Sequence, residues 1–493
     1  MHGMTWTRAT VGLWMSAILG IVPGPVWAGH HLSSASPPGD ASDRVIPFVV
    51  GLRDPATDMA QQMWELAELG YQEYESSALL QRYLAANGFV VTAGVADIPT
   101  AFVATYGSDG PNIAILAEFD ALPGLSQLPE PRRTPLTDGA PGHACGHHLF
   151  GAASTTAAVA LARWLAEEEI SAKITLVGTP AEEGGSGKVY LVRAGIFDDV
   201  DIVLHWHPGD VNSASPSTST ANKSGRFTFT GRAAHAALAP DLGRSALDGV
   251  EAMNFMVNMM REHIPQESRI HYVITNGGDA PNIVPETAQV YYYVRHPDKD
   301  QAAALFDRVA LVAKAAALGS ATEVDIEVMH GNYPLLPNET LARLVHNNFR
   351  EIGGISYNAE ERRFAQKIQE TLPKVRYALG SEQDIAPFQF RQGMGSTDVG
   401  DVSWLVPTVG FTTASWVPGT PAHSWQAVAA GGMSIGHKGM MLAAKLLAKT
   451  GAQLALSPKV IQRAQVELER RQGPNFRYQA LLGDRAPPLD YRR

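Results

Sequence analysis

The chain has 493 residues, of which 45% are apolar and 18% are charged, so it is long enough for two or three domains around a large core. Its 39 Lys and Arg residues against 49 Asp and Glu residues give a net charge of −10, and the absence of a basic stripe argues against a nucleic-acid binder. The single cysteine excludes an intrachain disulfide, and 46 Gly with 32 Pro residues favour a loop-rich globular protein over a coiled coil.

The first 28 residues have the pattern of a secretory signal peptide. Arg8 supplies a positive charge, residues 9–22 are apolar, and residues 26–28 fit a small-residue cleavage site. The apolar run is short for a transmembrane helix, although an uncleaved membrane anchor is the alternative. We therefore expect an exported protein, periplasmic or secreted, with no stable membrane span after removal of the signal. Residues 29–43 are predicted to form a Ser/Pro-rich spacer.

From residue 44 onward, apolar runs of strand length alternate with helical patterns. Buried strands that alternate with helices predict an α/β domain with a mostly parallel sheet flanked by helices. In such a sheet, ligands lie beyond the carboxyl ends of the strands. The predicted helices cover residues 55–69, 77–87 and 154–169, and the predicted strands cover residues 101–106, 113–118, 174–178 and 202–207.

A Ser/Thr-rich stretch at residues 213–221 is interpreted as a hinge, and a different pattern follows it. The order strand, helix, strand, strand, helix, strand predicts a ferredoxin-like α+β unit inserted into the first domain. The strands of this unit are predicted at residues 226–230, 270–275, 288–295 and 323–329, with helices at 244–263 and 299–318. The α/β pattern then resumes with helices at 340–352 and 431–449 and a strand at 406–411.

These patterns divide the chain into six segments. The first domain is expected to contain residues 44–221 and, after the insertion at 222–336, residues 337–456. The signal peptide (1–28) and spacer (29–43) precede it, and a charged tail at 457–493 is expected to be peripheral.

The sequence HACGHH at residues 143–148 is the first candidate for chemistry. Cys145 and His147 are one residue apart, so both can face one metal ion, and the glycine between them permits the tight backbone that this requires. Taken alone, the pair is more typical of a buried cysteine beside a surface histidine. Several potential ligands within six residues favour the metal site.

Two further motifs follow predicted strands. Glu182 and Glu183 come directly after the strand at 174–178, so one carboxylate can bind a metal while the other accepts a proton. The alternative interpretation of this motif is a solvated acidic turn with no role in chemistry. His205 and His207 close the strand at 202–207 and share one face of it, so either could turn toward the site, or both could be core histidines.

Two single histidines have weight only in combination with these motifs. His423 lies in a loop within PAHSW, and His235 ends the first strand of the inserted unit within GRAAH. A lone histidine in either place is usually structural. A functional His235 would reach over the site and stabilise an oxyanion.

The ordered set AEFDALP, HACGHH, PAEEGG, LHWHP, GRAAH, PNIVP and PAHSW resembles the two-metal aminoacylase and glutamate-carboxypeptidase family of metallo-amidohydrolases. Within that family it is most similar to the branch of aminobenzoyl-glutamate hydrolase and the auxin-conjugate and hippurate hydrolases. The resemblance covers about residues 50–450. It implies a catalytic α/β domain with an inserted ferredoxin-like lid and dimerisation domain.

The resemblance also implies a role for each matching residue. Cys145 would bridge two divalent metal ions, with zinc expected first and manganese or cobalt as alternatives. Glu182 would be the general base, and Asp120 would hold a metal-binding histidine from behind. The remaining metal ligands would be His147, Glu183, His207 (with His205 as the alternate) and His423, and the substrate would be held by His235, Asn282 and Arg295.

Two departures from the family pattern concern the surroundings of this site. His148 stands where many relatives have Asp or Asn, which leaves open what supports His147. The loop at residues 395–398 matches the family's substrate loop only loosely.

The implied function is hydrolysis of the amide bond of N-acyl or N-aroyl amino acids, or small peptides, by metal-activated water and the Glu182 base. In relatives His235 acts across a dimer interface, so a homodimer through the inserted domain is expected. Two alternatives are an exported dimer that binds ligands without turnover and an amidase with Cys145 as nucleophile. The second leaves Glu182, Glu183 and His423 without a role.

Overall fold

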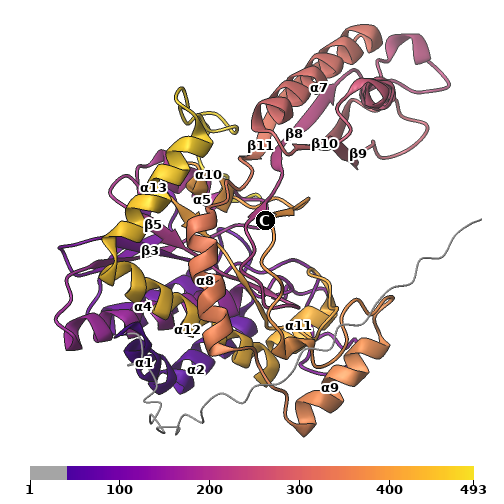
Figure 1. Cartoon of the computed structure of the whole chain (residues 1–493). Helices are drawn as coiled ribbons and strands as arrows, with labels where there is room; N and C mark the ends of the chain where they lie inside the picture. Colours follow the sequence, from indigo (N-terminus) through magenta and orange to yellow (C-terminus); the bar gives the residue numbers. More distant parts are fainter. Residues whose placement is uncertain (1–40, 493) are drawn as a thin grey trace, which may run out of the picture. The chain divides into compact units, whose positions relative to one another are not determined.

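A computed structural model describes residues 41–492 of the chain. The predicted signal peptide and the spacer up to residue 40 therefore lie outside the described residues. The order β1-β2-β4-β3-β5-β13 defines the main, six-stranded sheet, of which β3 and β5 are labelled in Figure 1. Its strands are β1 (Val90–Ala93), β2 (Phe102–Tyr106), β3 (Asn112–Ala117), β4 (Lys173–Gly178), β5 (Ile202–Leu204) and β13 (Thr408–Val409).

Three neighbouring pairings in this sheet are parallel, β4 with β3, β3 with β5, and β5 with β13, whereas β1 and β2 are antiparallel additions at one edge. The mostly parallel sheet predicted from the apolar runs is thus present. Every residue of β3 is buried, as expected for a strand covered on both faces. The two short parallel pairs β6 (His207–Gly209) with β14 (Thr412–Ala414), and β7 (Ser217–Thr218) with β12 (Arg391–Gln392), lie outside the main sheet.

The helices around the main sheet bury their apolar faces in one large core. α4 packs on β3 and β4 and against α2 and α12. These helices are α1 (Ile46–Gly51), α2 (Arg53–Leu66), α3 (Tyr74–Ala86), α4 (His147–Glu167), α5 (Gly187–Arg193), α8 (Glu339–Ile352), α9 (Ala359–Glu370), α10 (Val399–Ser403), α11 (Trp425–Gly431), α12 (Ser434–Leu456) and α13 (Pro458–Gln472).

α4 starts earlier than the periodicity predicts, because the chain enters the helix directly from the HACGHH motif through Gly146 in the left-handed region, at φ 79°. Within the described part of the chain, α4 is the helix that is long and apolar enough to span a bilayer, but 89% of its most apolar window is buried in the protein. Its apolar character is therefore that of a core helix.

The inserted unit forms a separate four-stranded antiparallel sheet in the order β11-β8-β10-β9, with its own apolar core. This order, with two helices on the sheet, is the ferredoxin-like arrangement predicted from the element order. Its elements are β8 (Ala221–Thr230), α6 (Ala246–Met260), β9 (Arg269–Asn276), β10 (Thr287–His296), α7 (Lys299–Ser320) and β11 (Glu323–Asn332).

Two sequence interpretations need correction. The stretch 213–221 is more than a hinge, because Ser217 and Thr218 form β7 and several of its hydroxyl groups line a cavity that also contains Glu182 and Glu183. The tail is not peripheral, since α13 packs on α8 and α12 and residues after it contact the loop that contains Glu183. Short elements such as β12 and α10 were not predicted, because five residues or fewer show no readable periodicity.

Candidate metal centre and active-site cavity

The candidate metal-binding residues gather where three parallel strands end. Glu118 and Asp120 follow β3, the Glu182–Glu183 pair follows β4, and His207 follows β5. Because β4, β3 and β5 run parallel, their carboxyl ends lie at the same edge of the sheet. This edge brings together segments that are distant in sequence. Glu118 and His207, for example, are 89 residues apart (207 − 118).

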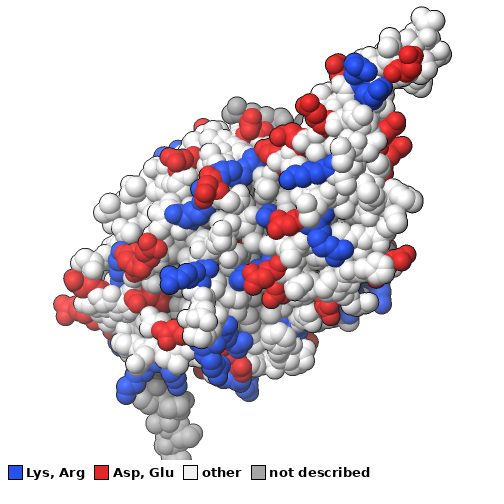
Figure 2. Space-filling view, turned by 90° about the horizontal axis from the view of Figure 1, so that it is seen from above, with Lys and Arg blue, Asp and Glu red and all other residues white. Residues whose placement is uncertain are grey.

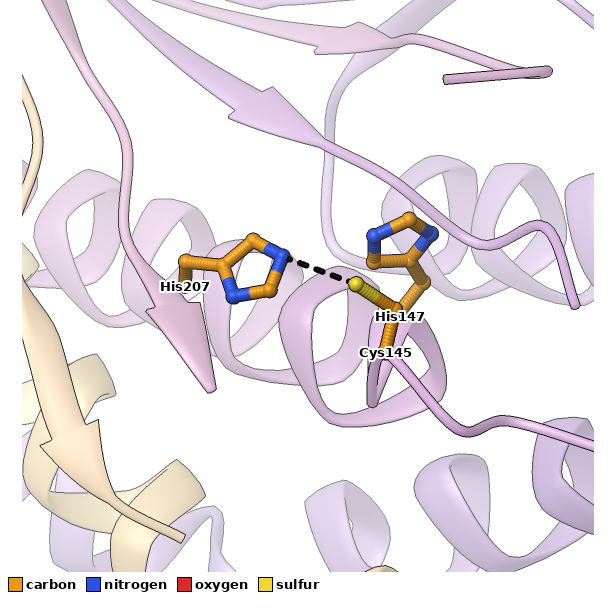
Figure 3. A group of neighbouring side chains, drawn as sticks. All are labelled: Cys145, His147 and His207. Atoms are coloured by element: carbon orange, nitrogen blue, oxygen red, sulfur yellow. Dashed lines mark hydrogen bonds between the residues drawn. The ribbon is translucent and has the colours of Figure 1, made fainter. Parts of the chain in front are cut away.

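Cys145, His147 and His207 form one compact group (Figure 3). Their potential ligand atoms all lie within 4.8 Å of one another, and His207 Nε2 is 3.3 Å from Cys145 Sγ. His207 Nδ1 donates to the carbonyl of Pro208 over 2.7 Å, which directs Nε2 toward the thiol. His205 is buried and also lines the cavity, but it belongs to none of the compact donor groups among the described residues.

His147 is oriented by the side chain of Asp120. Its Nδ1 lies 2.9 Å from Asp120 Oδ1, so Nδ1 carries the proton and Nε2 is left free. Nε2 is buried and makes no hydrogen bond in the described structure, although Glu118 Oε2 is 3.1 Å away. His148 does not support His147. Its Nε2 donates a hydrogen bond to the Gly431 carbonyl instead.

Glu183 and His423 form a second group that also includes Cys145. His423 Nε2 lies 3.2 Å from Glu183 Oε1, and the Glu183 amide donates to Asp120 Oδ2 over 2.9 Å. His423 has a φ of 58°, a left-handed conformation that its loop maintains at a cost in backbone energy. Asp120 therefore orients a residue in each of the two groups, one through a side chain and one through a backbone amide.

The donor set of these two groups fits two divalent metal ions. It combines a thiol, imidazole nitrogens and a carboxylate, and the thiol of Cys145 belongs to both groups, as a bridging ligand would. The buried His147 Nε2 has Glu118 Oε2 at 3.1 Å as its nearby polar atom, a contact that attracts only when the imidazole is protonated, so the neutral imidazole leaves Nε2 available to a metal ion. Each group thus offers protein atoms close enough together to share one ion.

Glu182 lines the same cavity and forms a third group with His147 and Glu183, whose potential ligand atoms also lie within 4.8 Å of one another. Burial, together with the neighbouring carboxylates Glu118 and Glu183, raises the pKa of Glu182 well above its usual range. A carboxylate whose pKa is raised is a stronger base than an ordinary carboxylate, which suits Glu182 to accept a proton from water.

A buried lysine lies behind this carboxylate cluster. Lys188, in the first turn of α5, is fully buried and places Nζ 2.7 Å from Glu118 Oε1 and 2.7 Å from Asp398 Oδ1. Its backbone amide donates to the other oxygen of Asp398 over 2.9 Å. Despite burial, the carboxylates Asp398, Glu118 and Glu182 raise the pKa of Lys188, so it stays charged. Lys188 was not among the residues singled out from the sequence, because a lysine beside PAEEGG shows no sign of a distant partner.

The groups open into a cavity of about 500 Å³ that is rich in hydroxyl groups. Arg391, from β12, is the one arginine or lysine among the residues that line it, and no described carboxylate forms an ion pair with it. The hydroxyl-bearing residues of the lining include Ser213, Ser215, Ser217, Thr218, Ser219, Ser396 and Thr397. No sequence motif indicated Arg391, because β12 reaches the cavity only through pairing with β7.

The predicted substrate-holding residues are not brought together with the metal groups within one chain. His235 and Asn282 do not line the cavity, although they lie close to each other through the backbone bond from Ala236 N to the Asn282 carbonyl. Arg295 does not line the cavity either, but its Nη1 lies 3.2 Å from the hydroxyl of Ser396, which does.

Fold and site together define a dinuclear metal-dependent hydrolase of carbon–nitrogen bonds, and comparison with known proteins agrees. The peptidase dimerisation domain model of the M20 family matches residues 220–321. The chain is 40% identical over 438 residues to a subunit of the p-aminobenzoyl-glutamate hydrolase of Escherichia coli, covering 83% of this chain and 91% of that protein. It is also 29% identical to the Xaa-Arg dipeptidase of Mus musculus, covering 83% and 88%.

Solved structures show the same fold. A dinuclear metal-binding peptidase of the M20 family from Bacillus subtilis superposes with a TM-score of 0.55 at 17% identity, covering 83% of this chain and 99% of that one. An aminobenzoyl-glutamate utilization protein from Klebsiella pneumoniae gives 0.58 at 18% identity, covering 83% and 98%. The chain belongs to the M20 family of metallopeptidases and amidohydrolases.

Proposed function

We propose that this protein cleaves the amide bond of N-acyl or N-aroyl amino acids, including aminobenzoyl-glutamate-like conjugates, or of small peptides. The observation that carries the proposal is the pair of donor groups sharing Cys145, with Glu182 beside them in one cavity. The names of the Escherichia coli hydrolase and the mouse dipeptidase support these two substrate types.

Cys145, His147, Glu183, His207 and His423 would hold the two ions, with zinc as first candidate because of the thiolate, and manganese or cobalt as alternatives. Bound there, the ions would supply a nucleophilic water at neutral pH and polarise the amide carbonyl. Asp120 keeps the His147 proton on Nδ1. Glu182 takes the proton from the attacking water on a carboxylate oxygen and returns it to the leaving amine nitrogen.

A homodimer through the inserted unit would complete the site, since His235 and Asn282 lie outside the cavity of their own chain. Edge strand β9 and helix α6 of that unit expose apolar side chains: Phe255 is 67% exposed, Met259 57% and Val273 55%. Apolar groups left in water on an unpaired edge favour association with a second copy. The Escherichia coli relative is named as one subunit of its enzyme, which makes a second kind of chain the alternative partner.

The boundaries of the domains and the place of action are part of the same proposal. The main domain would comprise residues 44–221 and 337–456, with 222–336 inserted and 457–493 as a tail. Export to the periplasm or outside the cell is proposed from the signal-like residues 1–28 alone.

On the face seen in Figure 2, acidic and basic side chains are interspersed, as on an ordinary solvated surface.

Removal and return of metal test the function directly. We expect the chelated protein to hydrolyse neither aminobenzoyl-glutamate, hippurate nor a dipeptide, and two equivalents of Zn²⁺, Mn²⁺ or Co²⁺ to restore turnover of at least one. Product release is followed by chromatography, and metal content by elemental analysis. Undiminished hydrolysis by fully metal-free protein would disprove the proposal and favour Cys145 as a nucleophile.

Arg391 provides a prediction about substrate preference. Because it is the cation of the cavity lining and has no carboxylate partner there, we expect it to bind a carboxylate of the substrate. Arg391→Met should raise KM for an acyl-glutamate roughly tenfold or more, with a much smaller effect on the corresponding amide without free carboxylates. Arg343→Met, which removes an exposed arginine paired with Glu339, is the matched control. Equal effects on both substrates would show that Arg391 does not bind a carboxylate.

A further inference from the structure

After α13 the chain packs along the fold as a segment of turns and irregular backbone, which we name the C-terminal strap and define as residues 478–492. The hydroxyl of Tyr478 donates to Asp401 Oδ1 over 2.8 Å at its beginning. Further along, Arg193 donates to the carbonyl of Arg485 over 2.8 Å, and Gln72 donates to that of Leu489 over 2.8 Å. The strap is thus tied to three separate parts of the main fold before it reaches the site.

Its last two described residues meet the loop that contains Glu182 and Glu183. Both donate to the same backbone atom, the Glu183 carbonyl oxygen: the Tyr491 hydroxyl over 3.0 Å and Arg492 Nη2 over 2.6 Å. The Tyr491 ring also packs edge-on against Tyr71 at 5.6 Å. A Cβ added at Gly70 would lie 2.4 Å from the Tyr491 oxygen, so the absence of a side chain there leaves room for the hydroxyl.

This loop needs external support, because its backbone is strained. Ala181 and Ser186 have φ values of 57° and 58°, in the left-handed region that residues with a Cβ disfavour. Such a conformation persists only where surrounding contacts hold it. Glu73 and Asp120 hold the loop from within the main fold by accepting from the amides of Ala181 and Glu183.

We propose that Tyr491 and Arg492 are positioning residues that fix the Glu182–Glu183 loop through the Glu183 carbonyl, so that the Glu183 carboxylate faces Cys145 and His423. Asp120 holds the amide of Glu183 and the strap holds its carbonyl, which together leave the peptide planes on either side of Glu183 little freedom to rotate. Because Glu183 would be a metal ligand, the strap acts on metal affinity without contacting metal or substrate. The inference rests on the proposed function only for the identity of that ligand.

The test measures metal binding rather than turnover. Full-length wild-type protein and variants are stripped of metal and titrated with Co²⁺, and the visible spectrum reports both affinity and ligand geometry. Tyr491→Phe removes one oxygen and keeps the ring. Combined with Arg492→Met, it removes both donors, and we expect roughly tenfold weaker binding of Co²⁺ and an altered spectrum, as for other residues that orient metal ligands. Arg492→Lys keeps a donor and should restore part of the affinity in the Tyr491→Phe background.

Tyr478→Phe is the matched control, because it removes a comparable hydroxyl bond from the same strap but at Asp401. It should lower thermal stability as much as Tyr491→Phe while leaving Co²⁺ affinity and spectrum unchanged. If Tyr491→Phe with Arg492→Met binds Co²⁺ like wild type, or if Tyr478→Phe weakens binding equally, the positioning role is wrong. Failure of the wild-type protein itself to bind Co²⁺ would instead refute the proposed function, and the positioning role with it.

Discussion

Glu182→Gln is expected to slow amide hydrolysis by about 10²–10⁴-fold while the protein keeps both metal ions. The side-chain amide has nearly the same shape as the carboxylate but cannot accept the proton of the attacking water. Its surroundings are already adapted to an uncharged group, since burial and the neighbouring carboxylates raise the pKa of Glu182. The fold and metal content should therefore survive, and kcat should fall with little change in KM.

The adjacent residue supplies a matched control for this experiment. Glu183→Gln makes the same chemical change one residue further along, in the group with Cys145 and His423. We expect Glu183→Gln to lose metal as well as turnover, measured by elemental analysis after dialysis against metal-free buffer. If the two variants lost the same amount of metal, or if Glu182→Gln turned over at the wild-type rate, the division of roles between the two carboxylates would be incorrect.

Lys188→Met is expected to destabilise the fold by about 3–5 kcal/mol. The substitution removes the lysine cation between Glu118 and Asp398, whose side chains are 2% and 0% exposed. It leaves the buried Asp398 without a cation and the buried Glu118 with only His147 beside it. Asp398 would keep its hydrogen bond from the backbone amide of residue 188 but would lose the one from the Lys188 side chain. The melting temperature, measured by calorimetry on metal-free protein, should fall by several degrees.

Lys449→Met tests whether the stability lost in Lys188→Met comes from the buried carboxylate partners or from removal of a buried lysine as such. The Lys449 side chain is 1% exposed, but its partners Asp43 and Glu351 are 47% and 57% exposed, so water can solvate them after the change. We expect a cost of about 1 kcal/mol or less for Lys449→Met. Equal losses for the two variants would mean that burial of the carboxylates near the site does not determine the effect.

Much of the fold could be predicted from local patterns. The strands β2 to β5 and the helices α2 to α4 were found because apolar runs and helical periodicity are properties of neighbouring residues. The ferredoxin-like order of the inserted unit followed from the same patterns. Short elements such as β12 escaped, since β12 has two residues and forms only through pairing with β7.

The candidate site likewise contains residues that the sequence could indicate and residues that it could not. Cys145, the Glu182–Glu183 pair and the His205–His207 pair could be singled out because each lies in a short motif at the end of a predicted strand or before a helix. Arg391 and Lys188 could not, because a single cation acquires meaning only from what it faces, and their surroundings come from distant segments.

The sequence by itself determined the kinds of donor atom available, their order along the chain and the edge of the sheet at which they would meet. Local chemistry and strand periodicity suffice for this, because parallel strands bring their carboxyl ends together. Tertiary structure alone decided that His207 rather than His205 faces Cys145, that Lys188 stays charged between two buried carboxylates, and that the tail reaches Glu183. These facts depend on side-chain direction and on contacts between residues as much as 309 positions apart, which no local pattern encodes.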